Sequence, residues 1–172
     1  MLKEIKERSS CRKFDTNRYP SDEDIDKIVQ AGLLAPSAVN FQESVIIVIK
    51  DKKTRDAIME LNDSFRTVAG RGDPFYGAPV IFLVMNKKTQ FTQYDGALVM
   101  ENMMLEATHL GLGSIWIHRA KEEVASGKLK EILKDAPYNF DEYEGVGHMA
   151  LGYSLVDEYP PKEIKPNRVY KI

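Results

Sequence analysis

The sequence has little cysteine: Cys11 is the only one among its 172 residues. An internal disulfide is therefore impossible, and a reducing, cytoplasmic environment is the simplest expectation. Long apolar runs are also missing, since none approaches the roughly 20 residues that a membrane helix needs. Residues 1–10, MLKEIKERSS, hold no apolar stretch resembling a secretion signal. We therefore expect neither a membrane-spanning nor a secreted protein.

A strong excess of charge is missing as well. The formal net charge is −2, which gives no reason to expect nucleic acid as a partner. The charges are unevenly distributed, however. Residues 1–18 carry six Lys and Arg against three Asp and Glu, and residues 157–172 carry four against three. If both ends fold back to one place, they form an anion site on an otherwise acidic body; the alternative is a pair of solvated termini.

Several common catalytic signatures are absent. His109, His118 and His148 lack the spacing of zinc ligands, so no metal site is expected. The GLGS at 111–114 lacks the third glycine of a dinucleotide fingerprint and follows a helix instead of opening one. Neither a G-x-S-x-G elbow nor a phosphate loop ending in G-K-[ST] occurs. Cys11 has no evident base beside it, so packing is its expected role.

The sequence does have an ordinary globular composition, with 43% hydrophobic and 29% charged residues. Periodicity predicts helices at 21–34, 51–61, within 92–114 (ended by Gly111) and at 121–134, and strands at 44–50, 79–85, 113–117 and 146–154. No linker or internal repeat interrupts this pattern. We expect one α+β domain spanning residues 1–172, with a mixed sheet flanked by helices.

The predicted helix within 92–114 is apolar nearly all round, so it must be buried on most sides. In a chain of this size, the plainest way is to pack one face on the sheet and another on a second subunit. We therefore expect a homodimer. The C-terminal segment 157–172 has three prolines and too little apolar content to fold alone, so an extended tail is expected.

Two loops carry side chains suited to binding. In RSSCRKF (8–14), the guanidinium groups of Arg8 and Arg12 and the hydroxyl of Ser10 suit a phosphate monoester. In APSAVNFQ (35–42), a proline-stiffened loop carries short polar side chains, including Ser37 and Asn40. The alternatives are a basic surface turn and an ordinary helix stop, both of which are common.

Taken together, these segments resemble the nitroreductase family of FMN enzymes. RSSCRKF matches the opening R-x-S-x-[RK]-x-F of that family, and LLAPSAVNFQ resembles its A-P-S-x-x-N-x-Q segment. DGALVMENMMLEATHLGLGSIWI is similar to its long buried helix, followed by L-G-L-G-S and an aromatic strand. ALGY and a basic tail match its C-terminal end. The resemblance implies an α+β homodimer with two FMN sites at the subunit interface.

The resemblance also implies which residues bind FMN. The phosphate and ribityl end would be held by Arg8, Ser9, Ser10 and Arg12, and closed by Lys165 and Arg168 from the tail. Pro36, Ser37, Ala38, Asn40 and Gln42 would lie near the isoalloxazine of the other subunit. Gly113, Ser114, Ile115, Trp116, Ile117, His118 and Arg119 would run past its reactive edge.

Two features depart from the better-known family pattern. His118 and Arg119 stand where many relatives have Gly or Glu-Gly. They would either stabilise charge on the reduced flavin or point to solvent. The short segment 62–79 leaves little room for the extra helices of larger relatives and is a candidate lid. Within it Phe65, Arg66, Phe75 and Tyr76 are candidate substrate contacts, without an order of preference.

The resemblance implies an FMN-dependent oxidoreductase working by ping-pong. NAD(P)H would deliver hydride to the flavin, and a nitroaromatic, quinone or related acceptor would then take the electrons. Because the flavin carries the chemistry, no side chain is expected to act as a catalytic acid or base. The alternatives are a specialised reductive enzyme of the same fold, such as a dehalogenase or a flavin-destroying enzyme, an FMN-binding protein without turnover, and a plain structural dimer.

Overall fold

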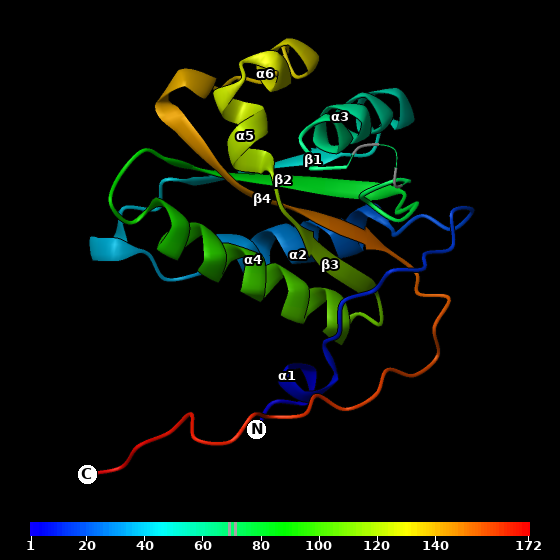
Figure 1. Cartoon of the computed structure of the whole chain (residues 1–172), viewed down its shortest axis with the longest axis vertical. Coiled ribbons are helices and arrows are strands. Elements are labelled where there is room, and N and C mark those ends of the chain that lie inside the picture. Colours follow the sequence, from blue (N-terminus) through cyan, green and yellow to red (C-terminus); the bar gives the residue numbers. More distant parts are fainter. Residues whose placement is uncertain (69, 71) are drawn as a thin grey trace.

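A four-stranded sheet organises the chain, in the order β1-β2-β4-β3 (Figure 1). The computed structural model describes residues 1–68, 70 and 72–172. The strands are β1 Ser44–Ile49, β2 Val80–Lys87, β3 Gly113–Ile117 and β4 Tyr143–Gly152. The helices are α1 Lys3–Glu7, α2 Asp22–Leu33, α3 Lys52–Ser64, α4 Thr92–His109, α5 Ala120–Ala125 and α6 Lys128–Ile132, with short 3-10 turns at Ala38–Asn40 and Phe140–Glu142.

Helices cover both faces of the sheet. In Figure 1, α2 and α4 lie on one face, and α3, α5 and α6 lie on the other. The alternation of side chains along β2 explains this arrangement. Its Val80, Phe82 and Val84 join the core cluster beneath α2 and α4. The intervening Ile81, Leu83 and Met85 join the cluster on the opposite face, and all six side chains are fully buried. A strand buried on both faces therefore reads as one continuous apolar run.

The prediction of a mixed sheet is wrong, because all three strand pairings are antiparallel. Both β2 and β3 run antiparallel to β4, so they are parallel to each other and are connected through α4. However, β4 lies between them and pairs with both. Within the described part of the chain, the parallel pairing is limited to one isolated bridge between Ser10 and Ser114.

The first long helix starts where its sequence predicts. The hydroxyl of Ser21 accepts a hydrogen bond from the Asp24 amide at 3.1 Å, which caps α2. The same hydroxyl donates to the Asp24 carboxylate at 2.7 Å, so Asp24 bonds back to the side chain of Ser21.

The predicted helix at 121–134 is two helices. Gly127 has φ +73°, a left-handed conformation that ends α5 and starts α6. The last strand also differs, because β4 begins at Tyr143 rather than at residue 146. Its start follows the turn Phe140–Glu142, whose Asn139 side chain accepts from the Asp141 amide.

Helix α4 buries one side within the chain and exposes the other. Its buried residues are Thr92, Asp95, Gly96, Val99, Met100, Met103, Met104 and Ala107. On the other side, Tyr94 is 72% and Leu98 is 44% exposed. Within one chain, α4 is therefore not buried on nearly all sides. The predicted second subunit stays a prediction. None of the helices that the structure describes is long and apolar enough to cross a membrane.

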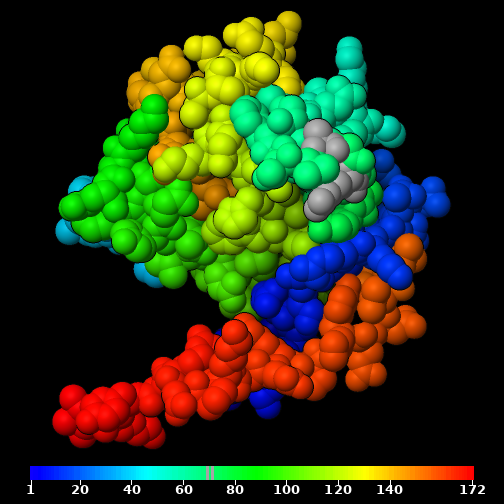
Figure 2. All heavy atoms as spheres, viewed as in Figure 1, coloured from blue at the N-terminus to red at the C-terminus, as the bar shows by residue number. Residues whose placement is uncertain are grey.

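The C-terminal tail is extended, as expected. The Tyr159 hydroxyl lies 3.2 Å from Ser154 Oγ, and residues 160–172 beyond it are all exposed. Figure 2 shows this tail in red as an arm that projects from the body. Ile164, Val169 and Tyr170 are each more than three-quarters exposed, at 78%, 79% and 88%. The tail thus presents apolar side chains that its own chain does not cover.

The packing of β4 against α5 generates the first prediction. A Cβ atom on Gly145 would overlap the backbone carbonyl of Ala120 at the start of α5. Because a backbone atom cannot rotate away, Gly145→Ala should lower the free energy of unfolding by about 3 kcal/mol. Urea denaturation measures this loss.

The matched control is Gly127→Ala, where no atom lies within 4 Å and only the positive φ opposes a side chain. We expect that variant to lose about 1–2 kcal/mol. Equal losses in the two variants would contradict the close packing of β4 on α5.

Candidate functional site

The RSSCR motif lies along the first half of β3. Ser10 forms the parallel bridge with Ser114, and the Cys11 amide donates to the Ser114 carbonyl at 3.0 Å. Because β3 is an edge strand, this segment extends the sheet at its open side. Two of the predicted groups, the N-terminal motif and β3, are therefore brought together by the fold.

The motif presents positive charge without a carboxylate to neutralise it. Arg8, Ser9 and Ser10 are half-buried, and Arg12 is exposed. Among the described residues, no carboxylate lies within 4.0 Å of either guanidinium group. Arg12 Nη1 makes one long bond of 3.4 Å to the Ser10 carbonyl. Two unneutralised guanidinium groups beside two hydroxyls fit a phosphate group, because each group remains a charged donor.

The second predicted loop is fixed by its own hydrogen bonds. The Ala38 amide donates to Asp95 Oδ1 on α4 at 3.1 Å, and the Gln42 amide donates to Ser37 Oγ at 3.0 Å. Gln42 Nε2 donates to Asn40 Oδ1 at 2.9 Å. Val39, Asn40 and Gln42 have φ of 46°, 58° and 53°, which is unfavourable for side chains with a Cβ, above all for β-branched valine. Such strain persists only where the surroundings hold it, and it concentrates at functional sites.

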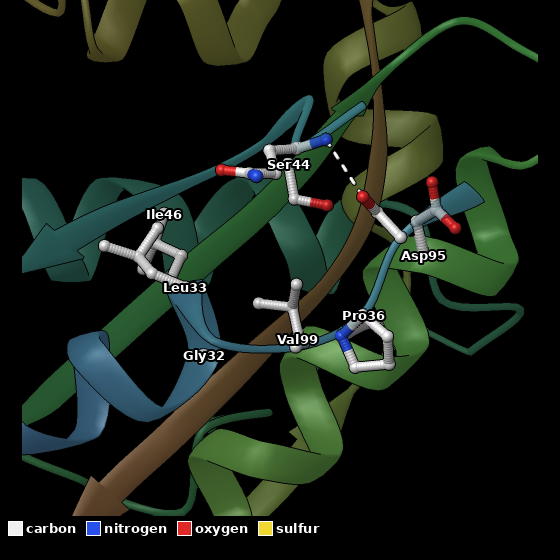
Figure 3. Close-up of a pocket in the computed structure, with 10 residues that line it drawn as sticks. Gly32, Leu33, Pro36, Ser44, Ile46, Asp95 and Val99 are labelled. Atoms are coloured by element: carbon white, nitrogen blue, oxygen red, sulfur yellow. Dashed lines mark hydrogen bonds between the residues drawn. The ribbon is translucent and has the colours of Figure 1, made fainter. Parts of the chain in front are cut away.

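A small cavity of about 190 Å³ lies beside this loop (Figure 3). Its walls come from α2, β1, α4 and the loop: Gly32, Leu33, Ala35, Pro36, Ser37, Gln42, Ser44, Ile46, Asp95 and Val99. The cavity therefore combines apolar walls with a buried carboxylate, an amide and two hydroxyls. Pro36, Ser37 and Gln42 are brought together here.

The two predicted loops lie at opposite ends of α4. The second loop is bonded to Asp95 in the first turn of α4, whereas Glu4 of α1, just before Arg8, is bonded to His109 in the last turn. These positions are 14 residues apart, or about 21 Å along the helix axis. Within one chain, the fold therefore keeps the loops apart, as Figure 1 also shows. A site that used both loops would need two chains.

His118 and Arg119, the two residues after β3, differ in exposure. His118 is exposed, and its carbonyl accepts from Asn62 Nδ2 at 2.8 Å. Arg119 is half-buried with φ +85°, and its Nη1 donates to Asn62 Oδ1 at 3.2 Å. Trp116 is half-buried, with its ring centre 6.3 Å from that of His118. Arg119 is therefore held by Asn62, and the predicted role of both side chains at the flavin stays a prediction.

Sequence reasoning missed the buried polar network behind this turn. Asn62, Glu123 and His148 are all 0% exposed. Glu123 accepts from Asn62 Nδ2 through Oε1, and its Oε2 lies 2.6 Å from His148 Nε2. These residues are distant in the sequence, and nothing in their spacing indicated a network. Because a buried carboxylate is costly unless it is hydrogen-bonded, the three side chains depend on one another.

An open cavity of about 590 Å³ lies in front of the same turn, lined by Arg66, Thr67, Val68, Asp73, Tyr76 and Arg119. Two of the candidate substrate contacts, Arg66 and Tyr76, thus face a cavity. Phe75 does not, because it is 0% exposed and its ring packs edge-on against His148 at 5.3 Å. Phe65 packs partly buried against the core. Residues 69 and 71 of the predicted lid lie outside the described residues.

The tail does not bring Lys165 and Arg168 to the N-terminal motif within the chain. Both are exposed on the extended arm, which leads away from the body (Figure 2). Their predicted contact with a phosphate therefore stays a prediction. In the part of the chain that the structure describes, no group of three His, Cys, Asp or Glu side chains is placed to hold a metal ion.

The fold is that of an α+β protein with an antiparallel sheet flanked by helices, and comparisons with known proteins give the family. The Nitroreductase family model matches residues 5–153, so the chain belongs to the nitroreductase family. It is 33% identical over 168 residues to an Archaeoglobus fulgidus protein named "Putative NADH dehydrogenase/NAD(P)H nitroreductase", covering 95% of this chain and 87% of the relative.

Solved structures agree with the fold. A Desulfitobacterium hafniense nitroreductase with bound FMN is 27% identical with a TM-score of 0.84, and each chain is covered completely. A Bacteroides fragilis nitroreductase with bound FMN has a TM-score of 0.82 at 24% identity, covering 96% of this chain and 94% of the other. The second likeness supports the fold alone. The predicted family is thus confirmed.

The contact that holds α1, just before the RSSCR motif, against the last turn of α4 depends on pH. A 2.9 Å hydrogen bond between His109 Nδ1 and Glu4 Oε1 raises the pKa of His109 above its ordinary 6.5, and Glu106 adds a smaller electrostatic contribution. The same bond lowers the pKa of Glu4. Because folding raises the pKa of His109, the contribution of this bond to the stability of the fold is fully present below pH 6.5. It is lost as the pH rises through the raised pKa.

An NMR titration of the His109 ring should therefore give a midpoint above 6.5 in the native protein. Glu4→Gln should bring the midpoint back toward 6.5, whereas Glu7→Gln, which removes an exposed carboxylate paired with Lys3, should leave it raised. A midpoint that does not respond to Glu4→Gln would show that this bond is not formed in solution.

Proposed function

We propose that the protein is an FMN-dependent NAD(P)H oxidoreductase that passes electrons by ping-pong to nitroaromatic, quinone or related small acceptors. Family membership supports the class. The observation that carries the cofactor assignment is the pair of unneutralised guanidinium groups, Arg8 and Arg12, lying along the start of an edge strand. FMN, when bound, supplies the transfer of hydride between the nicotinamide and the acceptor.

The chain's own residues bind and orient the cofactor. Arg8, Ser9, Ser10 and Arg12 bind the phosphate and ribityl end through charged and neutral hydrogen bonds. The backbone from Gly113 to Ile117, together with His118 and Arg119, orients the reactive edge of the ring. This assignment is supported by the place of β3 at the edge of the sheet, because an edge strand presents backbone donors that no neighbouring strand uses.

The second loop is supplied by another copy of the chain. Since the loops lie at opposite ends of α4, Pro36, Ser37, Ala38, Asn40 and Gln42 reach the ring only across a subunit interface. The exposed Tyr94 and Leu98 of α4 support a homodimer, because a second chain would cover them. The basic tail with Lys165 and Arg168 then crosses to the partner and closes the phosphate site.

Light scattering should give twice the mass of one 19.6 kDa chain.

Two alternatives differ from this proposal in a property that can be measured. An FMN-binding protein without turnover would bind the flavin through the same motif but would not be reduced by NAD(P)H. A dehalogenase-like enzyme of the same fold would be reduced but would prefer halogenated acceptors. The cavity lined by Arg66, Tyr76 and Arg119 gives room for a second substrate, which favours turnover over storage.

An absorption spectrum of the purified protein tests the proposal. We expect flavin bands close to one FMN per chain, bleached anaerobically by NADH or NADPH and restored by a nitroaromatic or quinone. A flavin that stays oxidised would assign the protein to the binding class. A colourless protein that takes up no added FMN would overturn the cofactor assignment.

Replacing both arginines tests the phosphate assignment. Arg8→Ala with Arg12→Ala should weaken FMN binding by roughly 10²- to 10⁴-fold, because two charge-assisted hydrogen bonds contribute about 1.5–3 kcal/mol each. Equilibrium titration with FMN measures the change. Lys6→Ala with Lys13→Ala removes the same charge from the same segment and should change the dissociation constant less than about threefold. Equal effects in the two double variants would mean that general charge, not these side chains, binds the flavin.

A further inference from the structure

We propose that the cavity around Arg119 binds the carboxylate of an anionic aromatic acceptor, so that the enzyme prefers acceptors carrying a negative charge. The inference deepens the proposed function and rests on it for turnover. It concerns the cavity of about 590 Å³ between the end of α3 and the turn after β3.

Arg119 is held in place from behind. Its Nη1 donates to Asn62 Oδ1 at 3.2 Å, and the amide nitrogen of Asn62 is fixed by the His118 carbonyl and by Glu123. Glu123 is fixed in turn by His148, 2.6 Å away and equally buried. The backbone at Arg119 is in the left-handed region, at φ +85°. A side chain supported by three fully buried polar groups loses little conformational entropy on binding a ligand.

The acidic side chains at the cavity are already paired with other groups of the chain. Arg66 Nη1 lies 3.0 Å from Asp63 Oδ1, an ion pair without hydrogen-bond alignment. Asp73 is paired with Arg55 and also accepts from the amides of Phe75 at 2.7 Å and Gly77 at 2.8 Å.

No carboxylate among the described residues lies within 4.0 Å of the Arg119 guanidinium group. Glu123 is separated from it by Asn62, and its two carboxylate oxygens are engaged by Asn62 and His148. The cavity therefore contains a positioned cation whose remaining donors are directed to no acid of the chain.

The turn that carries Asp73 and Tyr76 at the cavity is preformed. Tyr76 has φ +56°, and its amide donates to the Asp73 carbonyl at 3.1 Å. The hydrogen bonds from Phe75 and Gly77 to the Asp73 side chain fix the turn on both sides of Tyr76. The cavity thus combines the aromatic residue Tyr76 and the side chains of Thr67 and Val68 with the guanidinium group of Arg119. A planar aromatic acid matches this set, because its carboxylate accepts two parallel hydrogen bonds from the guanidinium fork while its ring contacts Tyr76 and Val68.

Two acceptors of the same shape test the proposal. 4-Nitrobenzoate and 4-nitrobenzamide share the ring and the nitro group and differ in charge. Steady-state kinetics with the FMN-loaded protein gives kcat/KM for each, and the readout is the ratio of nitrobenzoate to nitrobenzamide. Because both acceptors take electrons from the same flavin, any effect of a variant on the cofactor cancels in this ratio.

Arg119→Gln should lower the ratio about 10- to 100-fold, chiefly through KM for nitrobenzoate, because it removes a charge-assisted bidentate contact. Arg119→Lys should restore part of the ratio, since it keeps the charge but not the fork. The control, Lys121→Gln, removes an exposed cation two residues away that is paired with Glu144 at 3.0 Å, and should leave the ratio unchanged. A ratio that does not change in Arg119→Gln, or that falls equally in Lys121→Gln, overturns the proposal.

Binding without turnover separates this proposal from the proposed function. Calorimetric titration of the oxidised protein with benzoate and with benzamide should show benzoate binding more tightly, and Arg119→Gln should abolish the preference. If NAD(P)H fails to reduce the protein but the benzoate preference is present and lost in Arg119→Gln, the cavity assignment is supported and the proposed function is wrong. If NAD(P)H reduces the protein and benzoate binds no better than benzamide, the proposed function holds and the cavity assignment is wrong.

Discussion

The placement of β4 between β2 and β3 is the constraint on which the other features depend. It makes β2 and β4 the inner strands, buried on both faces, and leaves β3 at an open edge. Only an edge strand can accept the N-terminal segment at Ser10 and still present backbone groups to a ligand. The close approach of Gly145 on β4 to the Ala120 carbonyl ties the start of α5 to the same strand. The turn between β3 and α5, with Arg119, is therefore fixed at both ends by β4.

Local patterns in the sequence were sufficient to predict the position of most helices and strands. Ser21 and its following acids locate the start of α2, and the apolar run at 79–85 is long enough to specify a strand buried on both faces. The strand at 113–117 has the predicted bounds. The break at Gly127 was missed because a single glycine within a helical pattern is often tolerated, and its positive φ is decided by tertiary packing. Strand direction was missed for a similar reason, since local periodicity does not determine which strands become neighbours.

The candidate site was predictable only in part. The arginines at 8 and 12 and the polar loop at 35–42 could be selected because their side chains match a ligand chemistry and a family pattern. Asn62, Glu123 and His148 could not, because each is ordinary in its own segment and they meet only after three elements have packed. The same holds for Phe75, an aromatic residue in a polar, glycine-rich segment that suggests exposure, although packing against His148 buries it.

The open edge of β3 also has a consequence for colloidal behaviour. Exposed backbone donors and acceptors on an edge strand are a template onto which a strand of another molecule can add, and continued addition leads to aggregates. The isolated bridge at Ser10 blocks one position of this edge, while Ile115 and Ile117 make the rest of the strand apolar and β-branched. A ligand bound along the strand would cover the remaining backbone groups and prevent such addition. A ligand bound along β3 would therefore keep the protein dispersed as well as supply its chemistry.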